Sequence, residues 1–400
     1  MKTTEWDIVI AGGGPAGLEA AAAAAQAGCS VLVLEQSSQI GMPTRTSGGS
    51  FISEMQALGI PENLYHPVRS CRFIAPEQSA VFKYPVPQLC VMDVRGVFQF
   101  LAQRAANAGA HIALATAALS PILENGVVRG VRAKDRTSRE RLIHSRLVID
   151  ATGYRALLLK QTAANPRFSR FGVGAEYDLF APRYNQDEAL LIVGNQIAPA
   201  GYAWMLPWGN ARVRVGVGVI HPDSDANPDR YLEALIQNAS RWDVELQGAQ
   251  PIEHHSGLIP SSGLAQSFVS DGILAAGDAA GQASALVGEG IRWAMKAGQM
   301  AGGTAARAIR CGDVSARFLR QYETQWRSAY GRDLAIAYEI NKRIAAWGDT
   351  EWNRGAELLR LLTAEQFAHT LASNFIARWT AALLLSHPVA IGKSLRHLMS

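Results

Sequence analysis

Three glycines near the start of the chain, Gly12, Gly14 and Gly17, have the G-x-G-x-x-G spacing that brings a backbone against a pyrophosphate. An apolar run at 7–11 precedes them, an alanine-rich run follows, and a second apolar run ends on Glu35. This order predicts a βαβ unit in which the first N–H groups of the helix face phosphates and Glu35 accepts ribose hydroxyls. The residues expected to bind the dinucleotide here are Gly12, Gly14, Pro15, Ala16, Gly17 and Glu35.

Two later stretches distinguish between dinucleotides. GILAAGD (272–278) predicts a strand that ends on Asp278, and GEGI (288–291) predicts the start of a helix. Asp278 would accept ribityl hydroxyls, and the helix N-terminus near Gly290 would face the electron-rich edge of a flavin. A third stretch, RLVIDATG (146–153), predicts a strand that ends on Asp150. Because a nicotinamide enzyme needs no such segments, we expect FAD, held also by Gly277, Asp278, Gly288, Gly290 and Ile291.

The chain has no second G-x-G-x-x-G turn between a strand and a helix; RVGVGVI (214–220) lacks the third glycine. The sequence therefore predicts no separate nicotinamide domain. We expect an external electron donor, either NAD(P)H or a redox protein.

The stretch GYAWMLPWG (201–209) places large side chains on alternate positions of an expected strand. Tyr202, Trp204 and Leu206 would share one face. Pro207 lacks an N–H for the ladder, so it is expected to end or bend the strand. The aromatic face is either sheet core or the wall of a pocket, and the spacing alone is consistent with both.

Composition excludes several classes of protein. With 400 residues, 48% hydrophobic and 18% charged, the chain is expected to fold as two or three linked domains and not to be disordered. The net charge of +4 is spread along the chain without a basic run, so nucleic acid is not expected as a partner. No apolar run reaches the roughly 18 residues of a membrane span, and no signal peptide is recognised, so a cytoplasmic location is expected.

Metal binding is not expected. The four cysteines (Cys29, Cys71, Cys90 and Cys311) have no metal spacing and no CxxC pair, so reduced thiols are predicted. His254 and His255 are neighbours on an expected strand and would point to opposite faces.

The order of these motifs resembles FAD enzymes of the p-hydroxybenzoate hydroxylase type and, within them, the geranylgeranyl reductase family, which saturates isoprenoid double bonds. EQSSQIGMPTRTSGG (35–49) is similar to the family's segment after the second strand, and APAGYAWMLPWG (198–209) resembles its Tyr-x-Trp-x-Phe-Pro motif, with Leu206 for phenylalanine. VMDVRGVFQF (91–100) resembles the helix that carries a flavin-contacting arginine, here Arg95. The resemblance covers about residues 5–310.

The resemblance implies an α/β fold with a Rossmann-like FAD-binding domain, a smaller antiparallel-sheet substrate domain and a helical C-terminal region. The expected boundaries are 1–60, 92–170 and 268–312 for the first, 61–91 and 171–267 for the second, and 313–400 for the third. It further implies that Arg45 and Arg95 contact FAD. The residues expected to line an apolar, isoprenoid-like substrate are Tyr202, Trp204, Leu206 and Pro207.

Departures from the family pattern keep other chemistries open. Thr46 stands where the family usually has cysteine, and a hydroxyl is a poor acid; Ala285 stands where a proline is common. The alternatives are a flavin monooxygenase or oxidase, a halogenase (although position 202 is tyrosine, not tryptophan), or a lipid- or quinone-binding protein whose flavin does not turn over. The candidate catalytic residues are Thr46, Tyr202, Trp204 and Glu289, the last being either a carboxylate of a first helical turn or a proton carrier.

The tail around Trp347, Trp352 and Trp379 has apolar residues at helical spacing. Packing against the other domains is the expected use of such helices. A peripheral contact with a membrane surface is the alternative.

Overall fold

The computed structural model describes residues 6–375, and its first element is the expected βαβ unit. Strand β1 (Trp6–Ala11) leads into helix α1 (Pro15–Gln26) and strand β2 (Val31–Leu34), which pairs parallel with β1. On its other side β1 pairs parallel with β11 (Glu140–Asp150), so the strand that ends on Asp150 lies where the sequence predicts it. The sheet order is β17-β18-β11-β1-β2-β8, and β9 and β10 extend it antiparallel from β11.

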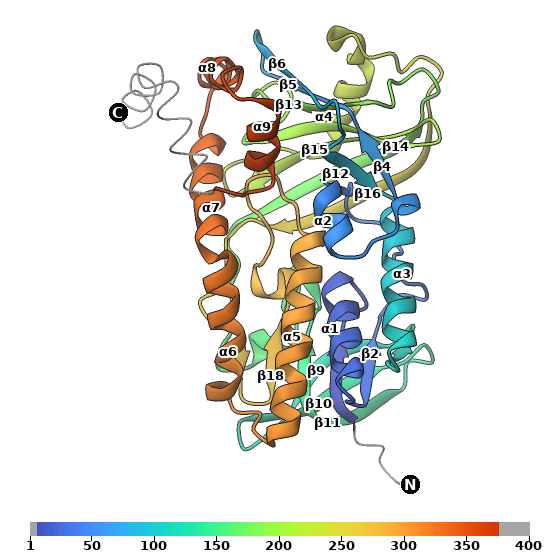
Figure 1. Ribbon diagram of the computed structural model, residues 1–400, viewed down its shortest axis with the longest axis vertical. Coiled ribbons are helices and arrows are strands. Elements are labelled where there is room, and N and C mark those ends of the chain that lie inside the picture. The colour runs from blue at the N-terminus through green and yellow to red at the C-terminus, as the bar shows by residue number, and fades with distance from the viewer. Residues whose placement is uncertain (1–5, 376–400) are drawn as a thin grey trace.

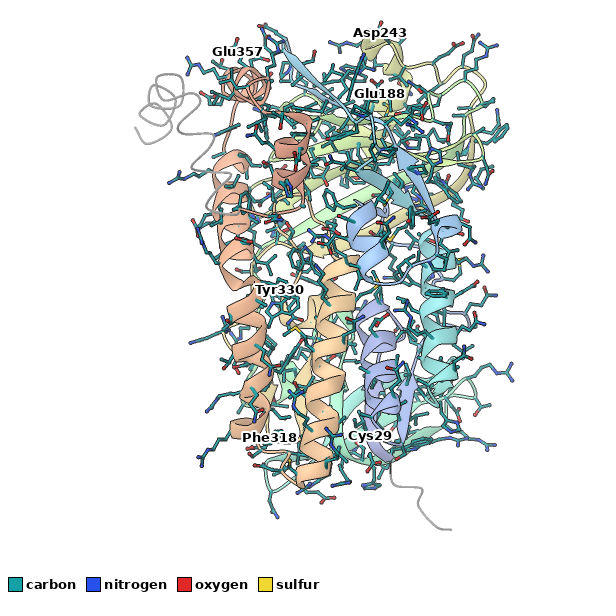
Figure 2. The ribbon with its side chains drawn as sticks, in the orientation of Figure 1. Cys29, Glu188, Asp243, Phe318, Tyr330 and Glu357 are labelled. Atoms are coloured by element: carbon teal, nitrogen blue, oxygen red, sulfur yellow. The ribbon has the colours of Figure 1, made fainter. Side chains whose placement is uncertain are left out.

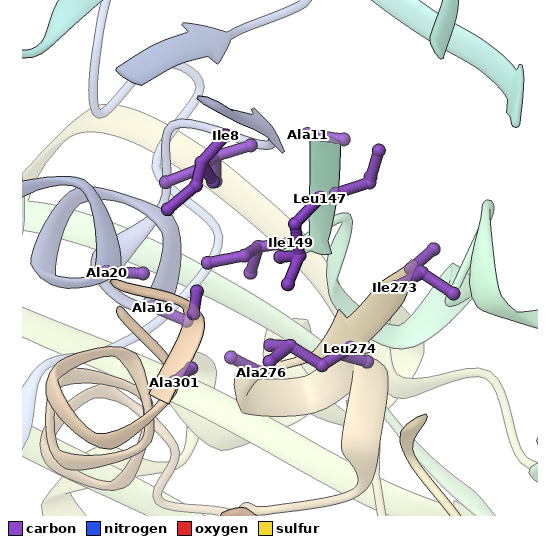
Figure 3. Close-up of a cluster of buried hydrophobic side chains, with 14 of the residues drawn as sticks. Ile8, Ala11, Ala16, Ala20, Leu147, Ile149, Ile273, Leu274, Ala276 and Ala301 are labelled. Atoms are coloured by element: carbon purple, nitrogen blue, oxygen red, sulfur yellow. The ribbon is translucent and has the colours of Figure 1, made fainter. Parts of the chain in front are cut away.

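Small side chains hold the helices of this sheet close together. Figure 3 shows side chains of β1, β11 and β18 (Ile273–Ala275) meeting alanines of α1 and of α5 (Ile291–Cys311). A Cβ on Gly298 would lie 2.3 Å from the Ala16 carbonyl oxygen, and one on Gly302 would lie 2.3 Å from that of Ala20. Because both sequences advance in the same direction along this contact, α1 and α5 run parallel and their N-termini point the same way.

A seven-stranded sheet occupies the other end of the elongated molecule (Figure 1). Its order is β16-β12-β15-β14-β13-β5-β6, and α4 packs on it. The strands of this sheet pair antiparallel, as predicted, at every pair except β13 and β5, which run parallel. Its strands and α4 are β5 (Ser70–Ile74), β6 (Ser79–Lys83), β12 (Phe171–Phe180), β13 (Glu188–Ile192), β14 (Gly201–Gly209), β15 (Arg212–His221), β16 (Gln250–Pro260) and α4 (Pro228–Gln237).

A three-stranded sheet of order β3-β7-β4 packs against strand β14 of the seven-stranded sheet. The segment 61–91 therefore contributes strands to two different sheets, since β4 and β7 join β3 while β5 and β6 join the seven-stranded sheet. The remaining elements are β3 (Gly49–Phe51), α2 (Ile52–Ala57), β4 (Tyr65–Val68), β7 (Leu89–Met92), α3 (Val94–Asn107), β8 (His111–Ala113), β9 (Ala117–Glu124), β10 (Val127–Lys134) and β17 (Val269–Ser270).

The C-terminal helices pack on both layers. Helix α6 (Ala316–Trp326) continues through a π-helical turn (Arg327–Gly331) into α7 (Arg332–Ala345) beside α5. At this turn Tyr330, labelled in Figure 2, contacts Trp293 and Trp326 with ring centroids 5.2 and 4.8 Å away.

Helices α8 (Asp349–Leu359) and α9 (Ala364–Leu371) lie against β5 and β6, where Trp352 contacts Phe73 and Phe367 stacks on Phe82. The expected packing role is confirmed for this part of the tail, whereas Trp379 lies outside the described residues. Between residues 6 and 375, no helix is both long and apolar enough to cross a membrane. The four cysteines are free thiols, and Cys29 lies at the far end of α1 (Figure 2).

Candidate functional site

The turn between β1 and α1 is shaped for the close approach of a ligand. Gly12 has φ +111°, and a Cβ there would lie 2.2 Å from the Ala151 carbonyl oxygen; a Cβ on Gly17 would lie 2.0 Å from the Gly12 carbonyl oxygen. Gly14 is the N-cap of α1, and none of the described residues places a heavy atom within 4 Å of a Cβ built there. Pro15 has no N–H, so the first N–H groups of α1 are those of Ala16 and Gly17. Because Gly14 has no side chain, these groups face open space that fits a pyrophosphate.

Glu35 lies beside this turn. Its Oε2 accepts the Gly13 N–H at 2.8 Å and its Oε1 accepts the Ser37 N–H at 2.7 Å. These bonds hold the carboxylate next to the glycine turn, where it remains half-buried. The position suits the expected ribose contact.

The second cofactor motif lies at the N-terminus of α5. Gly277 has φ +70°, and a Cβ on it would lie 2.9 Å from the Cβ of Ala16, so the two distant motifs meet in space. A Cβ on Gly290, the N-cap of α5, would lie 3.3 Å from Oδ1 of Asp278. Burial raises the pKa of the Asp278 carboxyl to about 6.

The two helix N-termini are offset along their common direction. Ala16 is the second residue of α1, whereas Gly298, which it contacts, is the eighth residue of α5. At 1.5 Å per residue, the N-terminus of α5 lies roughly 9 Å beyond that of α1. One helix start can therefore hold the pyrophosphate while the other faces the flavin of the same extended molecule.

Beyond the start of α5, a first cavity of about 150 Å³ separates it from the seven-stranded sheet. This cavity is lined by most of the residues that the sequence predicts to lie near the flavin. They are Arg45, Thr46, Tyr202, Trp204, Leu206, Gly288, Glu289, Gly290 and Ile291.

Two predicted residues lie elsewhere. Arg95 is exposed in the first turn of α3, where its Nη2 donates to Oε1 of Gln39 at 2.9 Å. Pro207, which was expected to line the substrate, does not line either of the two cavities described below. It shares the opposite face of β14 with Met205, part of the sheet core, and the strand continues past it with a register shift between Pro207 and Gly209.

The aromatic face of β14 is both buried and cavity-lining. The indole of Trp204 lies across glycines of neighbouring strands: a Cβ on Gly216 would lie 2.3 Å from its Cζ2, and one on Gly174 would lie 3.7 Å from its Cη2. Trp204 is only 7% exposed, and its Nε1 donates to Oε2 of Glu176 at 2.6 Å. The hydroxyl of Tyr202 donates to the Val287 carbonyl at 2.5 Å, which ties β14 to the loop before α5.

A second cavity, of about 300 Å³, begins on the far side of this aromatic wall. Tyr202 and Trp204 line both cavities, as do Leu191, Ile259, Val287, Gly288 and Leu371. Its other walls come mainly from apolar side chains of α7, α8 and α9, among them Ile340, Ile344, Trp352, Leu358 and Phe367. The site therefore consists of a small chamber beside the start of α5 and a larger apolar chamber behind it.

Glu289 immediately precedes the N-cap of α5, one position outside the helix. Both of its oxygens accept bonds from Nε of Arg292, at 2.8 and 2.6 Å. Burial raises the pKa of the Glu289 carboxyl, and the Arg292 charge opposes that rise. Arg292 also donates to the Ala372 carbonyl at 2.6 Å, so this pair anchors the end of α9 beside the first cavity.

Several residues of the first cavity, Glu176 and His255 among them, were not predicted from the sequence. Glu176 and His255 line the first cavity from β12 and β16, directly opposite each other across the ladder. His254 points to the other face and contacts Asp229 at 2.9 Å, as the alternation predicts. Within residues 6–375 no group of three His, Cys, Asp or Glu side chains is arranged to hold a metal ion. The pairing of β12 with β16, which brings Glu176 to His255, has no local sequence signal.

Comparison with known proteins gives matches along most of the chain. Residues 7–165 match the model of the FAD dependent oxidoreductase family, and residues 172–259 match the geranylgeranyl reductase catalytic domain. Digeranylgeranylglycerophospholipid reductase 2 of Methanopyrus kandleri is 31% identical over 379 residues, covering 90% of this chain and 94% of the relative. The digeranylgeranylglycerophospholipid reductase of Methanocaldococcus jannaschii is 31% identical over 361 residues, covering 88% and 90%.

Solved structures share the fold. A geranylgeranyl bacteriochlorophyll reductase-like protein from Thermoplasma acidophilum superposes with a TM-score of 0.86 at 23% identity, over 98% of this chain and 99% of the other. A flavin-dependent brominase variant superposes with a TM-score of 0.72 at 16% identity, over 98% and 100%.

Proposed function

Because the chain belongs to the geranylgeranyl reductase family of FAD-dependent oxidoreductases, we propose that it reduces carbon–carbon double bonds of a polyprenyl lipid. The observation that carries this proposal is the second cavity, whose walls are almost entirely apolar and which meets the first cavity at Tyr202 and Trp204. A hydrocarbon chain offers no hydrogen bonds, and flat aromatic and branched aliphatic walls suit it.

FAD would be held by the glycine turn after β1 and by the N-termini of helices α1 and α5. The N–H groups of α1 would bind the pyrophosphate, Glu35 would bind the adenosine ribose, and Asp278 would bind the ribityl chain. Gly288 and Gly290 let the start of α5 approach the flavin. The cofactor residues are proposed to be Gly12, Gly14, Pro15, Ala16, Gly17, Glu35, Arg45, Arg95, Gly277, Asp278, Gly288, Gly290 and Ile291.

The reaction requires a hydride and a proton. Reduced FAD, when bound, supplies the hydride. The chain's own residues orient the alkene: Tyr202 and Trp204 confine it between the two cavities, so that one double bond at a time lies in the first cavity. The buried aromatic wall also excludes water from that chamber. The proton must come from a cavity group, and Thr46 is poorly suited because an alcohol is a weak acid.

The electrons come from an external donor, NAD(P)H or a redox protein. The lipid substrate resides in a bilayer, so the chain takes it up by peripheral contact with a membrane surface. The membrane contact follows from the proposed substrate, and the external donor follows from the lack of a second G-x-G-x-x-G turn in the sequence.

The decisive experiment is anaerobic reoxidation. The protein is reduced chemically, mixed with digeranylgeranylglycerophospholipid in detergent, and its flavin absorbance is followed together with the mass of the lipid. We expect the oxidised flavin spectrum to return with a gain of two hydrogens per double bond, while a fully saturated analogue has no effect. Reoxidation by oxygen alone, coupled to oxygenation or halogenation of an added aromatic compound, would contradict the proposal and favour the oxidative alternatives.

A further inference from the structure

A line of hydrogen-bonded side chains connects the solvent to the first cavity across the seven-stranded sheet. Glu253 and His255 lie two positions apart on edge strand β16, with Oε2 of Glu253 2.8 Å from Nε2 of His255. On β12, Oε1 of Glu176 lies 3.2 Å from Nδ1 of His255, and its Oε2 accepts the indole N–H of Trp204 at 2.6 Å. The Glu253 side chain is 42% exposed, whereas Glu176 and His255 are 4% and 5% exposed.

The geometry indicates where the proton is held. An ionised carboxylate only accepts hydrogen bonds, so a ring with a carboxylate at each nitrogen donates from both and carries a positive charge. Burial lowers the pKa of His255, but the hydrogen bonds to Glu176 and Glu253, together with the charge of Glu176, outweigh it, and the net shift is upward against an opposing effect of Arg214 on β15. The hydrogen bond to His255 in turn lowers the pKa of Glu253.

Other groups around the first cavity are worse proton donors. Burial, and then the charges of Glu176 and Glu289, raise the pKa of Tyr202, whose hydroxyl already donates to Val287. Glu289 is paired with Arg292. Arg45, in the loop against β16, is a guanidinium that does not release its proton.

We propose that Glu176 is the proton donor of the reduction and that His255 and Glu253 reload it from the solvent. This assignment rests on the proposed function. It gives a buried carboxyl group the role for which Thr46 is chemically unsuited.

Each turnover consumes one proton along this line. His255 transfers its Nδ1 proton to Oε1 of Glu176, and the Glu176 carboxyl gives it to one alkene carbon while the hydride, carrying both electrons, adds to the other carbon. The C=C π bond is lost and two C–H bonds form, which leaves Glu176 as a carboxylate. The neutral imidazole keeps its Nε2 proton on Glu253, and a proton from the solvent returns to the free Nδ1 and restores the cation.

The kinetic test compares three variants with a matched control. Glu176→Gln keeps an acceptor for the indole but cannot donate an acidic proton, so we expect lipid-dependent reoxidation to slow about 10²-fold or more. His255→Gln should slow it less and remove the pH dependence, in which the wild-type rate falls as pH rises through the raised pKa of His255. Glu253→Gln should also slow it less and should move that pH dependence to lower pH, because the bond to Glu253 helps to raise the pKa of His255. The control is His254→Gln, because His254 faces Asp229 on the opposite side of the same strand.

Rates and pH profiles for Glu176→Gln and His255→Gln that match those of His254→Gln would overturn the assignment. A readout without substrate separates this failure from failure of the proposed function. NMR titration of the imidazole resonances should give His255 a pKa above its ordinary value, which falls in Glu176→Gln, and the Trp204 indole N–H should shift over the same pH range.

If the wild-type protein does not act on polyprenyl lipids but this titration is found, the proton line is supported and only the proposed substrate of the protein is wrong. If His255 titrates at its ordinary value and the Trp204 signal does not move, the proton line is refuted whatever the substrate.

Discussion

The contact between Gly216 and Trp204 predicts a large effect from a single methyl group. In Gly216→Ala the new Cβ would lie 2.3 Å from Cζ2 of the Trp204 indole and 2.7 Å from its Nε1. Gly216 is not in the left-handed backbone region, so alanine is not strained by its own conformation. The indole must therefore move away from β15.

The cost has two parts. Moving the indole weakens the 2.6 Å bond from its Nε1 to the Glu176 carboxylate, and a hydrogen bond to a charged group contributes about 1.5–3 kcal/mol. Overpacking of a well-filled site costs about 1–3 kcal/mol in addition. We expect Gly216→Ala to lower the free energy of unfolding by about 3–5 kcal/mol.

Gly174→Ala is the matched control, because its Cβ would meet the same indole at 3.7 Å, an ordinary van der Waals contact. We expect the stability of this variant to stay within about 1 kcal/mol of wild type. Denaturant unfolding followed by circular dichroism, with lipid-dependent reoxidation of the folded protein, measures both. Equal stabilities of the two variants would refute the packing of the Trp204 indole against Gly216 of β15.

Three further predictions concern the cofactor and the C-terminal helices. Glu35→Gln should weaken FAD binding about tenfold or more, since hydrogen bonds to a charged acceptor contribute about 1.5–3 kcal/mol each; an unchanged Kd in a fluorescence titration would place the ribose elsewhere. Ribityl hydroxyls donate to an ionised Asp278, so FAD affinity should fall about tenfold per pH unit below the raised pKa of about 6 and level off above it; titrations at several pH values should show this slope in the wild type and not in Asp278→Asn. Phe367 stacks on Phe82 with centroids 3.8 Å apart, so Phe367→Ala should cost about 3–5 kcal/mol of unfolding free energy; a melting temperature equal to wild type would show that α9 does not depend on this contact.

The cofactor end of the site was predictable because its signals are local. Gly12 needs glycine for its positive φ and Gly17 needs it because the helix lies against the Gly12 carbonyl, so much of the motif is encoded in adjacent residues. The helix that starts after Gly290 is equally short-range and was found where the sequence predicts it, whereas the strand before it ends at Ala275 and Asp278 lies in the 3-10 turn that follows. The alternation on β14 likewise placed Tyr202, Trp204 and Leu206 on one face.

What the sequence could not determine depends on strand order and on contacts between distant segments. The parallel pairing of β13 with β5 follows a long connection and leaves no periodic trace. The alternation on β14 puts Pro207 on the face opposite Trp204, but which of the two faces packs on the core and which lines a cavity is decided only by the fold.

The second cavity is closed by α7, α8 and α9, which lie more than one hundred residues beyond the aromatic strand. Their apolar spacing indicated packing but not the partner. Glu176 and His255 meet only because β12 and β16, about 80 positions apart, are neighbours in one ladder. The amino-acid sequence by itself determined the FAD-type βαβ unit, since a backbone turn is encoded in adjacent residues. The tertiary structure alone decided the apolar second cavity and the contact of Glu176 with His255, since burial and charge pairing exist only after distant strands have paired.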